Sequence, residues 1–153
     1  AAHTHSLVGL AVGIEYPPAT RMSIKTKSHA ETRGVRVLVE SRFLEEQSQP
    51  AAERFAFAYR VRIENVGSEV VQLRTRHWVI TDSYKHVEEV RGPGVIGEQP
   101  TLRPGQAFEY TSGAILRTQR GSMKGSYQMV TEGGEQFDAV IAEFALERPY
   151  SLN

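Results

Sequence analysis

A glycine-rich stretch carries the most specific chemical pattern in the chain. Gly92, Gly94 and Gly97 have the Gly-x-Gly-x-x-Gly spacing of dinucleotide-binding proteins, in which a helix N-terminus holds the pyrophosphate. That arrangement needs a helix after the third glycine, but Pro100 disfavours helical backbone at the residue before it. The sequence therefore predicts a loop at this position and argues against a dinucleotide-binding fold.

Two interpretations of the glycine loop stay open. In one, the loop forms a nest of backbone N–H groups around a pyrophosphate or nucleotide, and neighbouring cationic side chains add charge. Mg²⁺ would enter such a site only with the bound phosphate. The residues of this predicted anion site are Arg91, Gly92, Gly94, Gly97, Arg74, Arg76 and His77. In the other interpretation, which the sequence favours, the glycines only allow a tight crossover where a side chain would not fit.

The segment 74–78 belongs to the same argument because it holds two arginines and a histidine beside a tryptophan. The apolar alternation changes phase here, which aims side chains outward at a bulge. Arg74 and Arg76 could then bind a phosphate or carboxylate by forked hydrogen bonds. Equally, Trp78 could be a core anchor while the arginines pair with the glutamates at 88–89.

Patterns for catalysis and metal binding are missing from the sequence. The chain has no cysteine, which excludes disulfides, thiolate metal ligands and a thiol nucleophile. Its five histidines lack ligand-like spacing, and it contains neither a Gly-x-Ser-x-Gly elbow nor a His-Glu-x-x-His motif. The neighbouring Glu45 and Glu46 point to opposite faces of an extended chain and do not converge on a substrate. We therefore expect no enzymatic activity, no catalytic residue, no resident metal and no cofactor.

Composition narrows the range of partners and compartments. The 153 residues suffice for one domain with its own core. Basic and acidic side chains number 18 each, so no net charge drives the chain toward nucleic acid or an anionic membrane. The longest apolar run, residues 7–14, is too short to span a bilayer. We expect an intracellular protein, cytoplasmic or organellar (mitochondrion or plastid), with neither nucleic acid nor membrane among its partners.

Alternating apolar and polar residues indicate strands from residue 34 onward. The strongest alternation covers residues 55–63, and two phase changes predict β-bulges near 74–76 and 142–143. The pattern predicts an all-β domain at 34–153, an antiparallel immunoglobulin- or fibronectin-III-like β-sandwich of about seven strands. A closed barrel is the alternative.

Several ordered runs of residues carry a further signal. They are Val71-Gln72-Leu73 through Arg76-His77-Trp78-x-Ile80, then Glu89-Val90-x-Gly92-x-Gly94-Val95-Ile96-Gly97-Glu98-x-Pro100, then Leu102-x-Pro104-Gly105-x-x-Phe108-x-Tyr110-x-Ser112, and finally Gly121-Ser122-Met123-Lys124-Gly125. Together these runs resemble the ApaG domain family, and the likeness extends over about residues 34–148.

The resemblance implies a fibronectin-III- or immunoglobulin-like sandwich, in agreement with the strand pattern. Members of the family occur as small bacterial proteins and inside larger eukaryotic proteins, where the domain is taken to mediate protein contacts. Bacterial members are associated with diadenosine-polyphosphate metabolism and with cobalt and magnesium tolerance, and no enzymatic activity is firmly attached to them. A phosphate- or nucleotide-binding role proposed for the family's glycine motif would fall here on Gly92, Gly94 and Gly97.

Residues 1–33 have neither sustained periodicity nor a counterpart in the compact bacterial members of the family. We expect them to be a leader or extension that is ordered only where it docks on the domain. This expectation favours a longer parent protein.

These observations predict a non-enzymatic binding module whose partner is another protein of unknown identity. Phe43, Tyr84 and Tyr150 fit no core stripe, so an aromatic surface or a sheet edge could bind a peptide. The alternative function is binding of pyrophosphate or a nucleotide polyphosphate at residues 92–97, linked to nucleotide or divalent-cation homeostasis.

Overall fold

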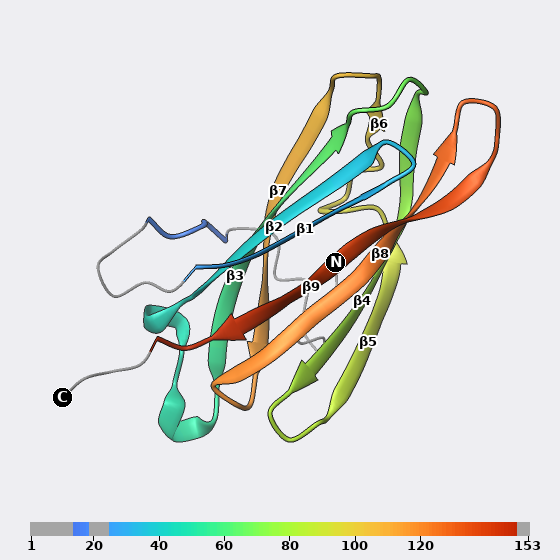
Figure 1. Cartoon of the computed structure of the whole chain (residues 1–153). Coiled ribbons are helices and arrows are strands. Elements are labelled where there is room, and N and C mark those ends of the chain that lie inside the picture. The colour runs from blue at the N-terminus through green and yellow to red at the C-terminus, as the bar shows by residue number, and fades with distance from the viewer. Residues whose placement is uncertain (1–13, 19–24, 150–153) are drawn as a thin grey trace.

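The computed structural model describes residues 14–18 and 25–149, which contribute to two antiparallel β-sheets packed face to face (Figure 1). The strands are β1 (Thr26–Thr32), β2 (Val35–Phe43), β3 (Phe55–Asn65), β4 (Val71–Asp82), β5 (Val87–Pro93), β6 (Thr101–Leu102), β7 (Ala107–Leu116), β8 (Arg120–Thr131) and β9 (Gln136–Glu147). Two 3-10 helices, η1 (Glu45–Gln47) and η2 (Pro50–Ala52), lie between β2 and β3. No α-helix occurs in the described ranges.

The strand order confirms the predicted antiparallel sandwich. One sheet runs β1-β2-β3-β7, and the other runs β5-β4-β8-β9, with β6 pairing with the start of β4. The described strands outnumber the seven expected because β1 lies within the segment 1–33 and β6 is only two residues long. The turn from β1 to β2 falls at residues 33–34, where the sequence pattern first became strand-like.

The alternation of β3 explains why one of its faces lies in the core, and it raises a question about the opposite face. The odd-numbered positions of β3, from Phe55 to Ile63, are apolar and buried in the core, because successive strand residues point to opposite faces. Ala56 and Ala58 point to the outer face of the sheet, yet they are only 4% and 0% exposed. Something other than the second sheet must therefore cover this part of the outer face.

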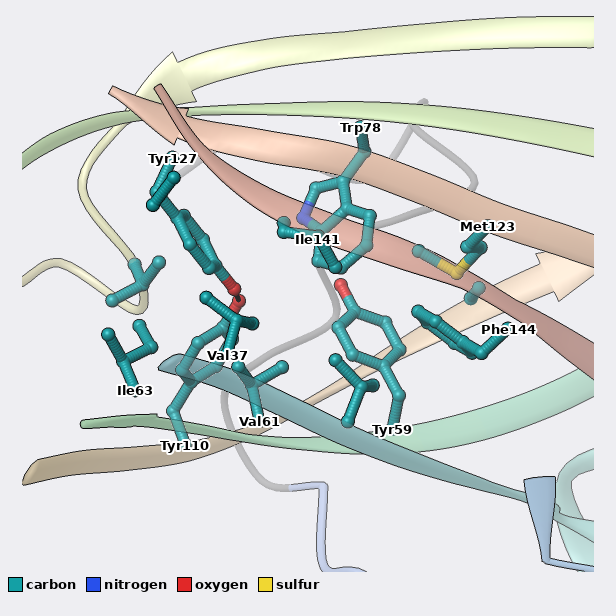
Figure 2. Packing of buried hydrophobic residues seen from close by; sticks show 14 of the residues in the cluster. Val37, Tyr59, Val61, Ile63, Trp78, Tyr110, Met123, Tyr127, Ile141 and Phe144 are labelled. Carbon is teal, nitrogen blue, oxygen red and sulfur yellow. Dashed lines mark hydrogen bonds between the residues drawn. The ribbon is translucent and has the colours of Figure 1, made fainter. Parts of the chain in front are cut away.

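Large aromatic side chains fill the space between the sheets (Figure 2). The ring of Trp78 lies edge-to-face with Tyr59 and Phe144, at centroid distances of 5.2 and 6.0 Å, a geometry that adds to the burial energy. The hydroxyls of Tyr110 and Tyr127 hydrogen-bond to each other at 2.5 Å inside this core. Burial raises the pKa of each of these tyrosines, to about 12 for Tyr59. Trp78 is thus the core anchor that the sequence offered as one of two alternatives.

Two bulges interrupt the sheet that contains β4, β8 and β9, and both predictions of them are confirmed. The pairing of β4 with β8 shifts register between Leu73 and Thr75. The pairing of β8 with β9 shifts between Met123 and Gly125, opposite residues 142–143. Each shift moves the apolar residues back to the core side of the strand.

Side-chain hydroxyls from β1 and β2 cover the outer edge of β9. Ser28 donates to the carbonyl oxygen of Ala142 at 2.7 Å, and Ser41 donates to that of Ala145 at 3.0 Å. Thr32 accepts the N–H of Val140 at 3.1 Å. These bonds occupy backbone groups that an exposed edge strand would offer to another chain.

Candidate functional site

The predicted glycine loop is a short β-hairpin. The N–H of Val95 donates to the carbonyl of Glu98, and the N–H of Glu98 donates back, both at 2.8 Å. The two residues between them, Ile96 and Gly97, have φ angles of 43° and 81°, as a type I′ turn requires. Gly94 has a φ of 61°, and a Cβ there would lie 2.3 Å from the Glu98 carbonyl oxygen. Backbone geometry alone thus explains the glycines at 94 and 97.

Arg76 ties this hairpin to β4. Its Nη1 donates to the carbonyl oxygens of Pro93 and Gly94, each at 2.9 Å. A Cβ at Gly92 would lie 3.0 Å from Nη2 of the same guanidinium, so the missing side chain at 92 makes room for Arg76. The N–H of Gly94 in turn donates to the carbonyl of Arg74 at 2.9 Å. The amides of Gly94, Val95 and Glu98, which a nest would aim at an anion, all donate within the protein.

The structure places the predicted anion-site residues along the β4–β5 pair and its hairpin, but Arg76 and His77 point to opposite faces of the sheet. His77 lies opposite Arg91 across the β4–β5 pair, and Arg76 lies opposite Gly92. Nε2 of His77 contacts Oε1 of Glu89 at 2.7 Å, and Nη2 of Arg91 lies 3.7 Å from that same oxygen.

Arg74, at the bulge, instead donates from Nε to Oε1 of Gln72 at 2.9 Å. Of the predicted site residues, His77 and Arg91 already face the carboxylate of Glu89. The pairing alternative holds for Glu89, but its partners are His77 and Arg91 rather than the arginines of β4.

A second site, which the sequence did not suggest, covers the outer face of the four-stranded sheet. Ile14 and Tyr16, in the blue segment outside this sheet in Figure 1, pack on a small apolar cluster. The cluster is made of Leu44, Ala56, Ala58 and Ile115. We name it, together with Gly113, the outer-face groove.

The floor of the outer-face groove is built from the smallest side chains. Gly113 pairs with Ala58, and Ala58 pairs on its other side with Arg42. A Cβ at Gly113 would lie 2.5 Å from Cδ1 of Ile14, so the glycine leaves the space that the isoleucine occupies. Ile14 and Tyr16 pack over these small residues, which explains why Ala56 and Ala58 are buried although they point away from the core.

Two arginines hold the ring of Tyr16 at the end of the groove. The guanidinium carbon of Arg60 lies 4.5 Å from the ring centroid, and that of Arg42 lies 5.6 Å from it, within the range of cation–π attraction. Glu40 holds Arg60 by an ion pair of 2.5 Å. Burial, followed by the nearby charge of Glu40, raises the pKa of Tyr16 to about 12. The tyrosine therefore stays neutral at physiological pH.

Two polar atoms in this site have no hydrogen-bond partner among the described residues. They are the hydroxyl of Tyr16 and Nε of Arg42, and both are buried. Arg42 as a residue is only 6% exposed. Unpartnered buried donors weaken the fit of the segment that covers them.

The aromatic surface expected from the sequence is not formed by the described residues. Phe43 packs edge-to-face on Phe57 at 5.5 Å and joins the core. Tyr84 is exposed in the turn after β4, and Tyr150 lies outside the described residues. The sequence feature that could have revealed the outer-face groove is the pair of alanines, Ala56 and Ala58, on the otherwise polar face of β3. The described residues also contain no group of three or more metal-ligating side chains, and no helix among them could cross a membrane.

The fold is that of a small antiparallel β-domain built from two sheets. Residues 45–131 match the ApaG domain, which is more than half of the chain. The chain belongs to the ApaG domain family.

Similar proteins include bacterial ApaG sequences and solved structures. The ApaG protein of Rhodospirillum centenum is 60% identical over 119 residues, covering 78% of this chain and 92% of that protein. The ApaG protein of Thiobacillus denitrificans is 55% identical, covering 78% and 94%. A solved structure of a Bordetella pertussis protein, provisionally named ApaA, is 47% identical with a TM-score of 0.74 and covers 82% of this chain and 98% of that one.

Proposed function

We propose that this protein is a non-enzymatic binding module that recognises a protein segment on the outer face of its β1-β2-β3-β7 sheet. One observation carries the proposal: Ile14 and Tyr16 already occupy the outer-face groove as a peptide would. The groove has an apolar floor, a position without a side chain at Gly113 that Ile14 covers, and cationic side chains at one end. These features match the general pattern of peptide recognition, in which pockets accept alternate side chains of an extended segment.

The chemistry of the groove supports binding rather than catalysis. The titratable groups described at this contact are two arginines, Tyr16, whose pKa is raised by burial, and Glu40. The carboxylate of Glu40 is held by Arg60, and neither the arginines nor the neutral tyrosine act as a base at neutral pH. Apolar burial and cation–π attraction are interactions that hold a ligand without changing it.

A peptide titration tests the proposal. A full-length Ile14→Ser/Tyr16→Ser variant, whose groove is opened, would be labelled with ¹⁵N and titrated with a synthetic peptide of residues 12–20. We expect saturable amide shifts confined to the groove, at Ala56, Ala58 and Gly113. The absence of shifts at several millimolar peptide would refute the proposal for this surface.

Small-anion binding is the second candidate function, since β4 and β5 carry cationic residues next to the glycine hairpin, His77 and Arg91 on one face of the sheet and Arg76 on the other. A titration of the wild-type protein with pyrophosphate, with and without Mg²⁺, tests it. Saturable shifts confined to residues 91–98 and 74–78 would support an anion site. Their absence would leave the glycines as backbone architecture, in line with the internal bonds of Arg76.

A further inference from the structure

We infer that the Ile14–Pro18 segment is a built-in competitor, which occupies the outer-face groove and must leave before a partner segment of the same chemistry can dock. The inference rests on the proposed function and adds its regulation. The partner would be an extended segment with an aliphatic side chain two residues before an aromatic one.

The spacing of the occupying segment defines this ligand class. Ile14 and Tyr16 are partly buried, whereas Glu15 between them is exposed. In an extended chain, residues two apart point to the same side, so both apolar side chains enter the groove and the glutamate faces solvent. A partner needs the same two side chains, and the residue between them is free to vary.

The ends of the groove distinguish the two side chains. The position of Ile14 lies over Gly113, where a Cβ on the floor would already collide with its Cδ1. The position of Tyr16 lies between Arg42 and Arg60, whose guanidinium groups favour the face of an aromatic ring. An aliphatic residue at the second position would lose that attraction and leave the arginines facing an apolar surface.

The internal segment is an imperfect ligand, as a displaceable one should be. The Tyr16 hydroxyl and Nε of Arg42 are both buried without partners in the described part of the protein. A phenylalanine at this position would bury no hydroxyl and would fit better. A competing segment with phenylalanine is therefore expected to displace the internal one more readily than a segment with tyrosine.

Intramolecular attachment compensates for this imperfect fit. A segment tethered to the domain that it binds has an effective concentration on the order of millimolar. With an intrinsic dissociation constant of about 0.1 mM or below, such a segment keeps roughly nine-tenths of the wild-type groove occupied. The apparent affinity of the peptide falls in proportion to the fraction of groove that is open, so the wild-type protein should bind it at least about tenfold more weakly than an opened variant.

The test compares full-length proteins by the anisotropy of a fluorescein-labelled peptide of residues 12–20. The proteins are the wild type, Ile14→Ser/Tyr16→Ser, and Tyr16→Phe. We expect the strongest binding to the double variant, binding at least about tenfold weaker to the wild type, and the weakest binding to Tyr16→Phe. Unlabelled peptide with phenylalanine at the aromatic position should compete better than the tyrosine peptide. Tyr16→Ser alone serves as the opened protein if the double variant does not fold.

Matched controls locate the binding. Arg60→Gln in the opened variant should weaken binding about fivefold or more, whereas Arg62→Gln should not, because Arg62 lies on the same face but pairs with Glu64 and Glu109. Equal binding to wild type and opened variant would overturn the internal competitor and leave the proposed function intact. Binding to neither would overturn the proposed function itself. Equal effects of the two arginine variants would show that the peptide binds elsewhere and overturn the site.

Discussion

Replacing Gly125 by alanine should be one of the most damaging single changes in this fold. Gly125 lies in β8 opposite Trp78 of β4, next to the bulge between β8 and β9. A Cβ there would lie 1.9 Å from the carbonyl oxygen of His77 and 3.2 Å from Cα of Trp78. The obstructing atoms belong to the backbone of a central strand, which cannot rotate away as a side chain can.

The geometry gives the size of the effect. Restoring a carbon–oxygen separation of about 3.5 Å would move β4 and β8 apart by more than 1 Å, beyond the range of ladder hydrogen bonds. Losing two or three such bonds at about 1 kcal/mol each, with looser packing of Trp78, should cost about 3–4 kcal/mol. That is a large share of the about 5–15 kcal/mol that stabilises a typical domain.

Urea denaturation followed by Trp78 fluorescence measures this loss. Gly133→Ala is the matched control, because its φ is not positive and its Cβ would meet only Oγ1 of Thr131, at 3.9 Å. It should be neutral or stabilising by up to about 1 kcal/mol through the unfolded state. A loss below about 1 kcal/mol for Gly125→Ala, or equal losses for both variants, would refute the reasoning.

The other predictions concern the buried polar groups. The side chain of Asn65 donates to two backbone carbonyls and accepts one backbone N–H, at distances of 2.7–3.0 Å. Asn65→Ala should therefore lower the free energy of unfolding, measured by urea denaturation, by about 2–4 kcal/mol. A change under about 1 kcal/mol would contradict this. Burial holds the pKa of Tyr59 at about 12, so this tyrosine ionises first in the unfolded chain, and the free energy of unfolding should fall as pH rises from about 10 to 12. The Tyr59→Phe variant should lose less free energy of unfolding over that interval. An identical pH dependence of the two proteins would count against the assignment. Ser28→Val frees the Ala142 carbonyl on the β9 edge and should promote self-association in size-exclusion chromatography, unlike the exposed control Lys27→Val; a monomeric Ser28→Val protein would argue against the edge-covering role.

Local pattern was enough to predict the sheets because the long strands β2, β3, β4, β8 and β9 each have one buried face. The alternation in β3 and the phase changes near residues 74–76 and 142–143 follow directly from the period of two in an extended chain. The family could also be recognised from ordered motifs, since they occupy turns and bulges that tolerate few residue types. Strand β1 was harder, because its inward residues are serine and threonine that bond to β9 instead of packing in the core.

The candidate sites depended on contacts that no local pattern contains. The glycine hairpin and its cations are adjacent in sequence or across one strand pair, so the sequence could bring them together. Whether Arg76 faces an anion or the carbonyls of Pro93 and Gly94 depends on where the turn places those oxygens. The residue types do not decide between these two partners of Arg76, because the outcome depends on small differences in the positions of the turn atoms.

The sequence by itself determined the all-β class, the bulges, the family and the absence of cysteine chemistry, because these follow from residue types and from spacing along one strand. Only the tertiary structure decided that Ala58, Gly113 and Tyr16 share one groove. These residues lie between 42 and 97 positions apart along the chain, yet nothing in the sequence near each one indicates the other two. Cross-strand register places the first two side by side, and a segment from outside the sheet covers them. Burial of that segment comes from apolar contact, which has no direction and so leaves no sequence motif.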